Sequence, residues 1–425
     1  MFDVTHRRAW VRRGLAVAAL ALAALVGSVA LDRAADRQIL RRHDEWTREV
    51  AQDRIRAASY RRPIVFGPPL DQNAADWYRQ AFSRPGEPTR DEFAQLTPLL
   101  DQGPGQDERI PPGIDAVCRD TAAIAHVSQA LRCTRCDWQL DYEMGGSSVF
   151  DHNARAVALV DCLTLTGHRA VKSRSYGSAA ESYLQVIALG CDLGAGNLIM
   201  NIVGVGAAKR GLAALGRLLT TIDYDPLLFS DVAGRVRKLQ PCLPTVHNGV
   251  RIDRLQAANA LIAEALTPVT AGTRPLNPVF PWHAFAAWHL SRDMALVTDL
   301  AGTATMADPQ ERFRVVNDLQ RRAAASSNPF VKEFVAGSWS GAVDEANALV
   351  HDAHAVLAII DIEQWHQQHG RYPDSRADAP SLADDDGVRY ERDPDGRGYS
   401  LVAISAVGTP QRLARRSADR PAVVR

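Results

Sequence analysis

Lysine is scarce in this sequence of 425 residues, which has four lysines although Lys and Arg together number 49. Asp and Glu also number 49, so the formal net charge at pH 7 is zero. A chain with no net positive charge has no overall electrostatic attraction for the negatively charged backbone of nucleic acid. We therefore expect no nucleic-acid partner.

Sequence signatures of catalysis are missing or incomplete. No HExxH zinc motif occurs, and the segment from Gly337 to Gly341 has Trp339 where a nucleophile elbow requires serine. Gly204-Val-Gly-Ala-Ala-Lys209 lies inside a helical pattern with no strand before it, which argues against a dinucleotide-binding turn. We expect no catalytic residue and no cofactor, and an enzyme is the less favoured class.

The N-terminus combines arginines with a long uncharged run. Arg7, Arg8, Arg12 and Arg13 precede Gly14 to Leu31, which contains no charged residue. As a helix rising ~1.5 Å per residue this run reaches roughly 27 Å, enough to cross the hydrocarbon core of a bilayer. We expect a single-pass anchor in the inner (cytoplasmic) membrane, with a cytoplasmic N-terminus and the bulk periplasmic. Cleavage as a signal peptide after Ser28-Val29-Ala30 is the alternative.

Six cysteines in an exported chain indicate possible disulfides. Cys133 and Cys136 form the one CxxC pair, and without a second such pair a zinc ribbon is excluded. We expect these two cysteines to form a structural disulfide or to remain free thiols. Cys162 and Cys191 fall at different heights of successive helices, so we do not expect them to pair.

Apolar residues at three- and four-residue spacing predict a mainly α-helical protein. The expected ranges are an anchor or signal segment at 1–31, membrane-proximal helices at 32–83, a Pro/Gly-rich connection at 84–113, a helical array at 114–335, a helix plus β-hairpin module at 340–408 and a disordered tail at 409–425. Asp151 and Ser175 occupy N-cap positions and Gly167 and Gly194 C-cap positions, which predicts repeat-like antiparallel helix pairs. Such arrays typically present a concave surface to a protein partner.

The C-terminal part resembles a known protein family. His369-Gly-Arg-Tyr-Pro373 after a long helix, followed by Gly387 to Tyr390 and Gly398 to Leu401, resembles the globular part of type II secretion pseudopilins. The resemblance covers about 65 residues and implies a helix packed on a hairpin. The overall plan, with Asn73-Ala-Ala-Asp-Trp-Tyr78 and Cys191-Asp-Leu193, looks like a loose group of anchored helical proteins of myxobacterial and planctomycete type, which implies no activity.

Histidines and acids gather near the C-terminus. His351 with His354, and His366 with His369, share helix faces at a spacing that suits a divalent metal. Asp384 and Asp386 lie in an acidic loop, where pseudopilins of the resembled type bind calcium. These residues are the candidate metal ligands, although solvated side chains are the favoured interpretation.

An aromatic cluster stands further upstream in the sequence. Trp282, His283, Trp288 and His289 follow one another at helical spacing, which predicts core packing or an aromatic ligand pocket, with the core favoured.

The absence of complete catalytic motifs and the expected helical array together favour a non-enzymatic, membrane-anchored binding or scaffolding protein of the cell envelope. A metal-assisted hydrolase using the C-terminal His, Asp and Glu residues is one alternative. An envelope-assembly component related to pseudopilins is the other.

Overall fold

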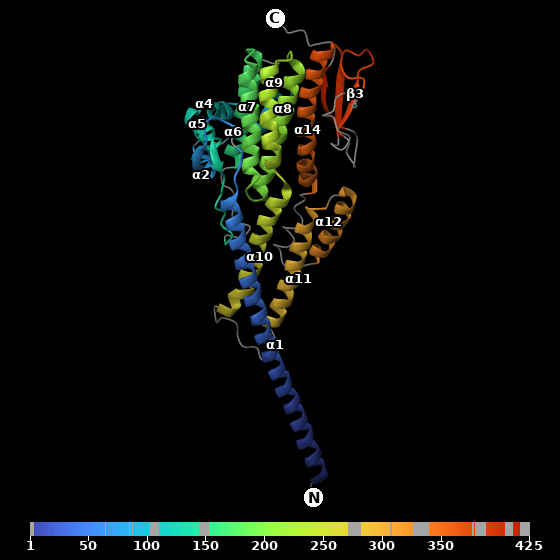
Figure 1. Ribbon diagram of the computed structural model, residues 1–425. Coiled ribbons are helices and arrows are strands. Elements are labelled where there is room, and N and C mark those ends of the chain that lie inside the picture. Colours follow the sequence, from blue (N-terminus) through green and yellow to red (C-terminus); the bar gives the residue numbers. More distant parts are fainter. Residues whose placement is uncertain are drawn as a thin grey trace.

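The fold was described from a computed structural model, which is mainly helical with a few short strands (Figure 1). The structure describes residues 4–63, 65–84, 86, 88–102, 110–143, 153–270, 282–306, 308–325, 340–375, 378, 388–403 and 411–416.

A single helix, α1 (Val4–Ser59), carries the N-terminal apolar run and continues without a break into the helical body (Figure 1). Its lower part projects from the body, and only 6% of its apolar window is buried. Further along, Ile39, Trp46 and Val50 are buried against the body, since α1 contacts α10 (Val246–Thr270) and α11 (Trp282–Thr303). The segment expected to be an anchor and the helix expected after it are therefore one continuous helix.

A second helix also has the length and composition to cross a membrane. This helix is α8 (Leu198–Thr221), and 56% of its apolar window is buried inside the protein. Its neighbours are α7 (Tyr176–Leu193), α10 and α14 (Ser340–His369). Because protein rather than lipid surrounds it, we assign α8 to the core and α1 to the exposed apolar segment.

Glycines set the close packing of α7 on α8. A Cβ added at Gly190 would lie 2.7 Å from the backbone oxygen of Gly204, and a Cβ at Gly204 would lie equally close to the backbone nitrogen of Gly194. No side chain fits at such a distance. Gly204 of the 204–209 segment thus serves the packing of α8 on α7, whereas Gly206 has open space around it.

A small unit of short elements lies beside the upper end of α1. Its helices are α2 (Ala74–Phe82), α3 (Arg90–Gln102), α4 (Pro112–Arg119) and α5 (Thr121–Ala130), and its strands are β1 (Leu70–Asn73) and β2 (Cys133–Arg135). The two strands pair in parallel, a pairing that sequence patterning missed because each strand has only three or four residues. This unit packs on α6 (Asn153–Lys172).

The remaining elements complete the body and a C-terminal module. Helices α9 (Pro226–Leu239) and α12 (Pro309–Ala324) contact α14, and a 3-10 turn, η2 (Gln240–Cys242), links α9 to α10. Strands β3 (Val388–Arg392) and β4 (Tyr399–Ala403) form the expected hairpin, and β5 (Gln411–Arg416) adds a third antiparallel strand. Since β5 pairs with β4, the expectation of disorder from residue 409 is wrong for these residues.

Two helix boundaries differ from the apolar pattern for local reasons. Helical spacing runs from Asp115 to Leu131, yet this segment forms two helices, because Asp120 leaves helical geometry and its carboxylate accepts a hydrogen bond from the Ala123 amide, capping α5. Gly167 does not end α6, which continues to Lys172; instead its missing side chain makes room for the Tyr183 ring. Asp151 lies outside the described residues.

Ser175 and Gly194 do lie at the ends of α7 as expected, although Ser175 makes no side-chain capping bond.

Candidate functional site

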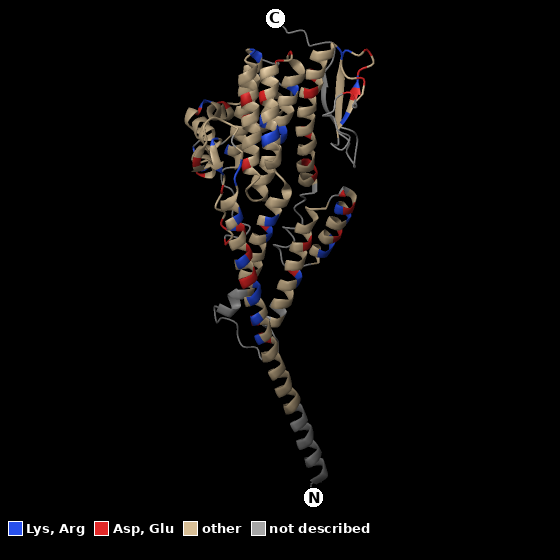
Figure 2. Ribbon diagram, in the orientation of Figure 1, with Lys and Arg blue, Asp and Glu red and all other residues tan. Residues whose placement is uncertain are grey.

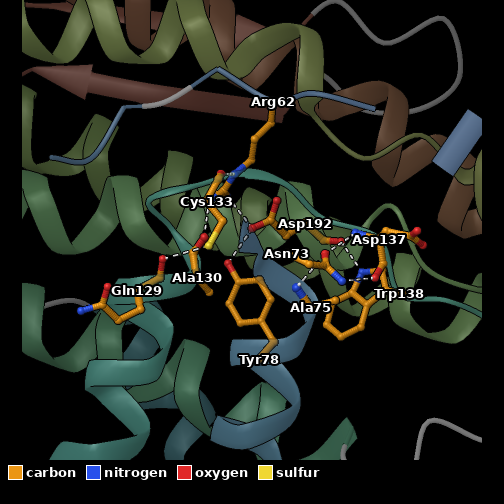
Figure 3. A network of polar contacts seen from close by, with 10 residues as sticks. All are labelled: Arg62, Asn73, Ala75, Tyr78, Gln129, Ala130, Cys133, Asp137, Trp138 and Asp192. Carbon is orange, nitrogen blue, oxygen red and sulfur yellow. Dashed lines mark hydrogen bonds and ion pairs between the residues drawn. The ribbon is translucent and has the colours of Figure 1, made fainter. Parts of the chain in front are cut away.

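Two short motifs of the sequence meet in one buried polar network (Figure 3). Tyr78, at the centre of α2, donates a hydrogen bond of 2.6 Å to Asp192 Oδ2, near the end of α7. Trp138 Nε1 donates to the backbone oxygen of Asp192 at 2.8 Å. Tyr78 is fully buried and Asp192 is 1% exposed, so the network is closed to solvent.

Arg62 holds the network together from the segment that follows α1. Its guanidinium forms an ion pair with Asp192 and donates hydrogen bonds to the backbone oxygens of Cys133 (2.9 Å) and Ala130 (2.5 Å). Desolvation lowers the pKa of Arg62, but the charge of Asp192 outweighs it and holds that pKa above its ordinary value. Burial raises the pKa of Asp192, and the charge of Arg62 opposes that rise. The contacts of Arg62 tie the end of α1 to both α5 and α7.

Asn73 organises the segment that leads into the site. Its side chain caps α2 by accepting from the Ala75 amide, and it exchanges two hydrogen bonds of 2.8 Å with the Asp137 backbone. An asparagine suits this position because it is both donor and acceptor. Trp138 is thereby placed over Tyr78, with the ring centroids 5.8 Å apart.

A cavity of about 870 Å³ opens beside this network. It lies between the end of α1, the segment 136–143, the C-terminal turn of α7 and the segment 241–252. Its apolar and aromatic lining consists of Ala57, Ala58, Tyr60, Trp138, Leu140, Tyr142, Ala195, Pro241, Leu243, Pro244 and Ile252. Seven charged side chains also line it, namely Asp53, Arg54, Arg56, Asp137, Asp141, Glu143 and Arg251, so the walls are part apolar and part charged. Its volume is typical of small-molecule sites.

One wall of the cavity carries an organised charge cluster. Asp53 of α1 is 3% exposed, and it forms ion pairs with Arg251 of α10 and with Arg56. The Tyr142 hydroxyl donates to the same carboxylate. Burial raises the pKa of Tyr142 to about 12, so this phenol stays a donor at neutral pH. The cluster fixes α1, α10 and segment 136–143 against one another.

Three cysteines also face the cavity. Cys136 and Cys191 are buried, and burial raises the pKa of both thiols well above the ordinary value. Cys242 is half-buried next to the Tyr60 hydroxyl, and burial raises the pKa of its thiol too. Burial therefore disfavours the thiolate, which is the form that acts as nucleophile and metal ligand.

The disulfide occurs elsewhere than the CxxC pair. Cys133 and Cys136 are both free and buried, and burial raises the pKa of Cys133 to about 11. Cys118 of α4 and Cys162 of α6 form the disulfide, with their Cα atoms 5.1 Å apart. Of the two alternatives for Cys133 and Cys136, the structure has the free thiols. Cys162 and Cys191 are not joined, as expected.

The candidate histidines of α14 point to separate neighbours. His354 Nε2 lies 2.6 Å from the Gln240 side chain, and His366 stacks on Tyr372 with centroids 4.2 Å apart. His369 stacks on Trp365 in its own helix, and His351 is half-buried. Asp384 and Asp386 lie outside the described residues. Within the described part of the chain, no three His, Cys, Asp or Glu side chains form a group that could hold a metal ion.

Glu363 has a structural partner instead. It is 1% exposed, and the Tyr399 hydroxyl of β4 donates to it at 3.1 Å. This bond joins the hairpin to α14.

Sequence reasoning identified Asn73, Tyr78 and Asp192 only as parts of motifs, and it missed Arg62, Asp53 and Tyr142. The one local signal was the Asn73 cap position; nothing local marks an arginine whose partners lie 68 to 130 residues away. No family model, curated protein or solved structure matches the chain.

Proposed function

We propose that this chain is a non-enzymatic, membrane-anchored binding protein of the cell envelope, and that it takes a small ligand with both apolar and polar groups into the cavity between α1 and the helical body. The cavity itself is the observation that carries the proposal. About 870 Å³ is enough for a drug-sized molecule, and the fixed cluster of Asp53, Tyr142 and Arg251 offers directional polar contacts.

The buried network gives the cavity a rigid frame. Arg62, Tyr78 and Asp192 join the end of α1 to α2 and α7, and Trp138 extends from this network into the cavity wall. A preformed wall lowers the entropy lost when a ligand binds. Consecutive helices α6, α7 and α8 pack as neighbours across short turns, which supports the antiparallel pairs of the expected array.

The anchor is the other half of the proposal. The uncharged part of α1 projects away from the body, and charged side chains begin above it (Figure 2). In the proposed topology Gly14–Leu31 spans the inner membrane and the body is periplasmic. The continuity of α1 through Ser28-Val29-Ala30 supports retention of this segment, since a peptidase would have to unwind the helix to cut there.

A reporter enzyme fused after residue 60 tests this address. We expect activity from a reporter that works only outside the cytosol, and a fusion active only in the cytosol would refute the topology.

The geometry supports the two alternatives less well. The histidines of α14 diverge, which disfavours a metal-assisted hydrolase. Leu349, Val356 and Ile359 of α14 are buried, and α14 packs on α8 and α9, whereas a pseudopilin helix must be free to pack in a filament.

Native mass spectrometry of the full chain released from its own membranes tests ligand binding. We expect a bound small molecule on the wild type and on Ala51→Trp, and its loss from Ala57→Trp. Ala57 lines the cavity, whereas Ala51 is exposed on the same helix and serves as the matched control. If neither substitution changes the occupancy, the ligand binds elsewhere and the cavity proposal fails.

A further inference from the structure

The start of α11 lies at the level where α1 leaves its uncharged run. The Ala284 amide donates to Asp32 Oδ1 at 3.2 Å, and Asp32 is the first charged residue after Leu31. Further up, Gln38 Nε2 donates to Ser291 Oγ at 2.8 Å. The two contacts fix the register of α11 along α1, and both helices rise in the same direction (Figure 1).

This register sets the height of Trp288. Trp288 follows Ala284 by four residues, which places it ~6 Å above Asp32 at ~1.5 Å per residue. If Leu31 marks the edge of the hydrocarbon core, Trp288 lies in the headgroup layer, which is roughly 5 to 8 Å thick on each side of a bilayer.

The side chain at this height suits a membrane surface. Trp288 is 57% exposed, so the expectation of core packing is wrong for this residue. The Arg292 guanidinium lies 5.2 Å from the centroid of its ring. Tryptophan is enriched at membrane–water interfaces because its ring is apolar while its N–H is polar. The Arg292 guanidinium is also ion-paired with the buried Asp293, so it orients the Trp288 ring without adding net charge.

The neighbouring part of α1 carries positive charges that would suit lipid phosphates. Arg33 and Arg37 are exposed two and six residues after Leu31, close to the level of Ala284 to Trp288. The acidic side chains at this level are less accessible: Asp32 is engaged with the start of α11, Asp36 is half-buried, and Asp293 is buried and paired with Arg292. The exposed charges on α1 at this level are therefore basic.

We propose that the N-terminal end of α11 is a second membrane contact, in which Trp288 of α11 and Arg33 and Arg37 of α1 bind the phospholipid headgroup layer. The contact rests on the proposed anchor, because α1 sets its height. Two points of attachment would hold the helical body at a constant angle to the bilayer. The cavity lies ~39 Å further along α1 and would keep a constant position with the body.

Nitroxide labels on the full chain in nanodiscs of phosphatidylethanolamine and phosphatidylglycerol test this contact. Single cysteines replace Ala24, Trp288 and Phe313 in a Cys242→Ser background, since the other free cysteines are buried. Phe313 is 62% exposed on α12 and serves as the matched control far from α1. Relaxation by lipid-soluble oxygen is compared with relaxation by a water-soluble nickel chelate.

We expect oxygen to dominate at 24, the chelate to dominate at 313, and an intermediate ratio at 288. A label at 288 that matches the label at 313, while 24 reports lipid, overturns the second contact and leaves the anchor intact. A label at 24 that reports water overturns the anchor itself, and the contact with it.

Brominated phospholipids give an independent readout with the native side chain. They should quench part of the tryptophan fluorescence of the full chain. Trp288→Phe should lower the fluorescence intensity lost to quenching, whereas Trp365→Phe, which removes a half-buried tryptophan of α14, should leave that lost intensity unchanged. An equal loss of intensity in wild type and Trp288→Phe contradicts the contact.

Discussion

The Tyr78 hydroxyl donates a hydrogen bond of 2.6 Å to the Asp192 carboxylate across a separation of 114 residues, and both side chains are buried. Tyr78 belongs to α2, the first helix after α1, and Asp192 to the core helix α7. With Arg62 on the other side of the same carboxylate, this contact decides how the end of α1 sits on the body, and therefore the shape of the cavity.

Removing Arg62 should destabilise the protein strongly. Arg62→Met leaves the Asp192 carboxylate buried without its cation, which costs about 3 to 5 kcal/mol of unfolding free energy. Denaturant unfolding of the full chain in detergent measures this loss.

Arg62→Met combined with Asp192→Leu should recover part of the lost unfolding free energy, because neither charge of the buried pair remains. Arg41→Met, which breaks an exposed ion pair with Glu45, should change stability negligibly. Equal effects of Arg62→Met and Arg41→Met would contradict the buried pair.

The disulfide between Cys118 and Cys162 should contribute to stability outside the cytosol. It closes a loop with a sequence separation of 44, and the entropy it removes from the unfolded chain corresponds to about 2 to 4 kcal/mol. We expect peptide mapping without reductant to recover a cross-linked 118–162 pair. The Cys118→Ser, Cys162→Ser variant should unfold at lower denaturant, whereas Cys133→Ser should leave the cross-link intact. Recovery of a 133–136 cross-link instead would show that the pairing is wrong.

Two glycines of α8 should respond in opposite directions to alanine. At Gly204 an added Cβ meets the backbone of α7, and overpacking of this kind costs about 1 to 3 kcal/mol. At Gly206, two residues along the same helix, nothing lies within 4 Å of the added Cβ, so the higher helix propensity of alanine should stabilise by about 0.5 to 1 kcal/mol. Melting temperatures of the two variants measure the contrast. A Gly204→Ala variant as stable as Gly206→Ala would disprove the close crossing of α7 and α8.

Acid should weaken the protein through His168. Its ring lies 2.7 Å from the Tyr183 hydroxyl, and burial lowers its pKa from 6.5 to about 4. Between pH 6.5 and pH 4, His168 is protonated in the unfolded chain and neutral in the folded protein. The contribution of His168 is therefore complete above pH 6.5 and is lost as the pH falls toward 4, by about 3 kcal/mol.

Other buried groups act in the opposite direction. Burial raises the pKa of Asp161 and of Asp253 to about 6, so each favours the folded state at low pH and loses that contribution as the pH rises toward 6. The test is therefore the difference between wild type and His168→Gln, with unfolding measured from pH 4 to 7. The gap in stability should narrow as the pH falls, and a gap independent of pH would refute the neutral buried imidazole.

Sequence pattern determined the helices because their signals are local. Asp225 before Pro226 and Asp308 before Pro309 are capping pairs, and α9 and α12 begin at these prolines. The exposed apolar run of α1 and the hairpin of β3 and β4 were equally readable, since composition and turn residues suffice for them.

Tertiary structure alone decided the rest, because contacts between distant residues leave no local pattern. The residues around Cys118 do not predict that it forms a disulfide with Cys162. Those around Arg62 do not predict its ion pair with Asp192. The exposure of Trp288 depends on where α11 lies along α1, although its spacing in the sequence is that of a core residue. Apolar periodicity predicts which residues avoid water. Only the packing of the helices decides whether protein or another environment surrounds those residues.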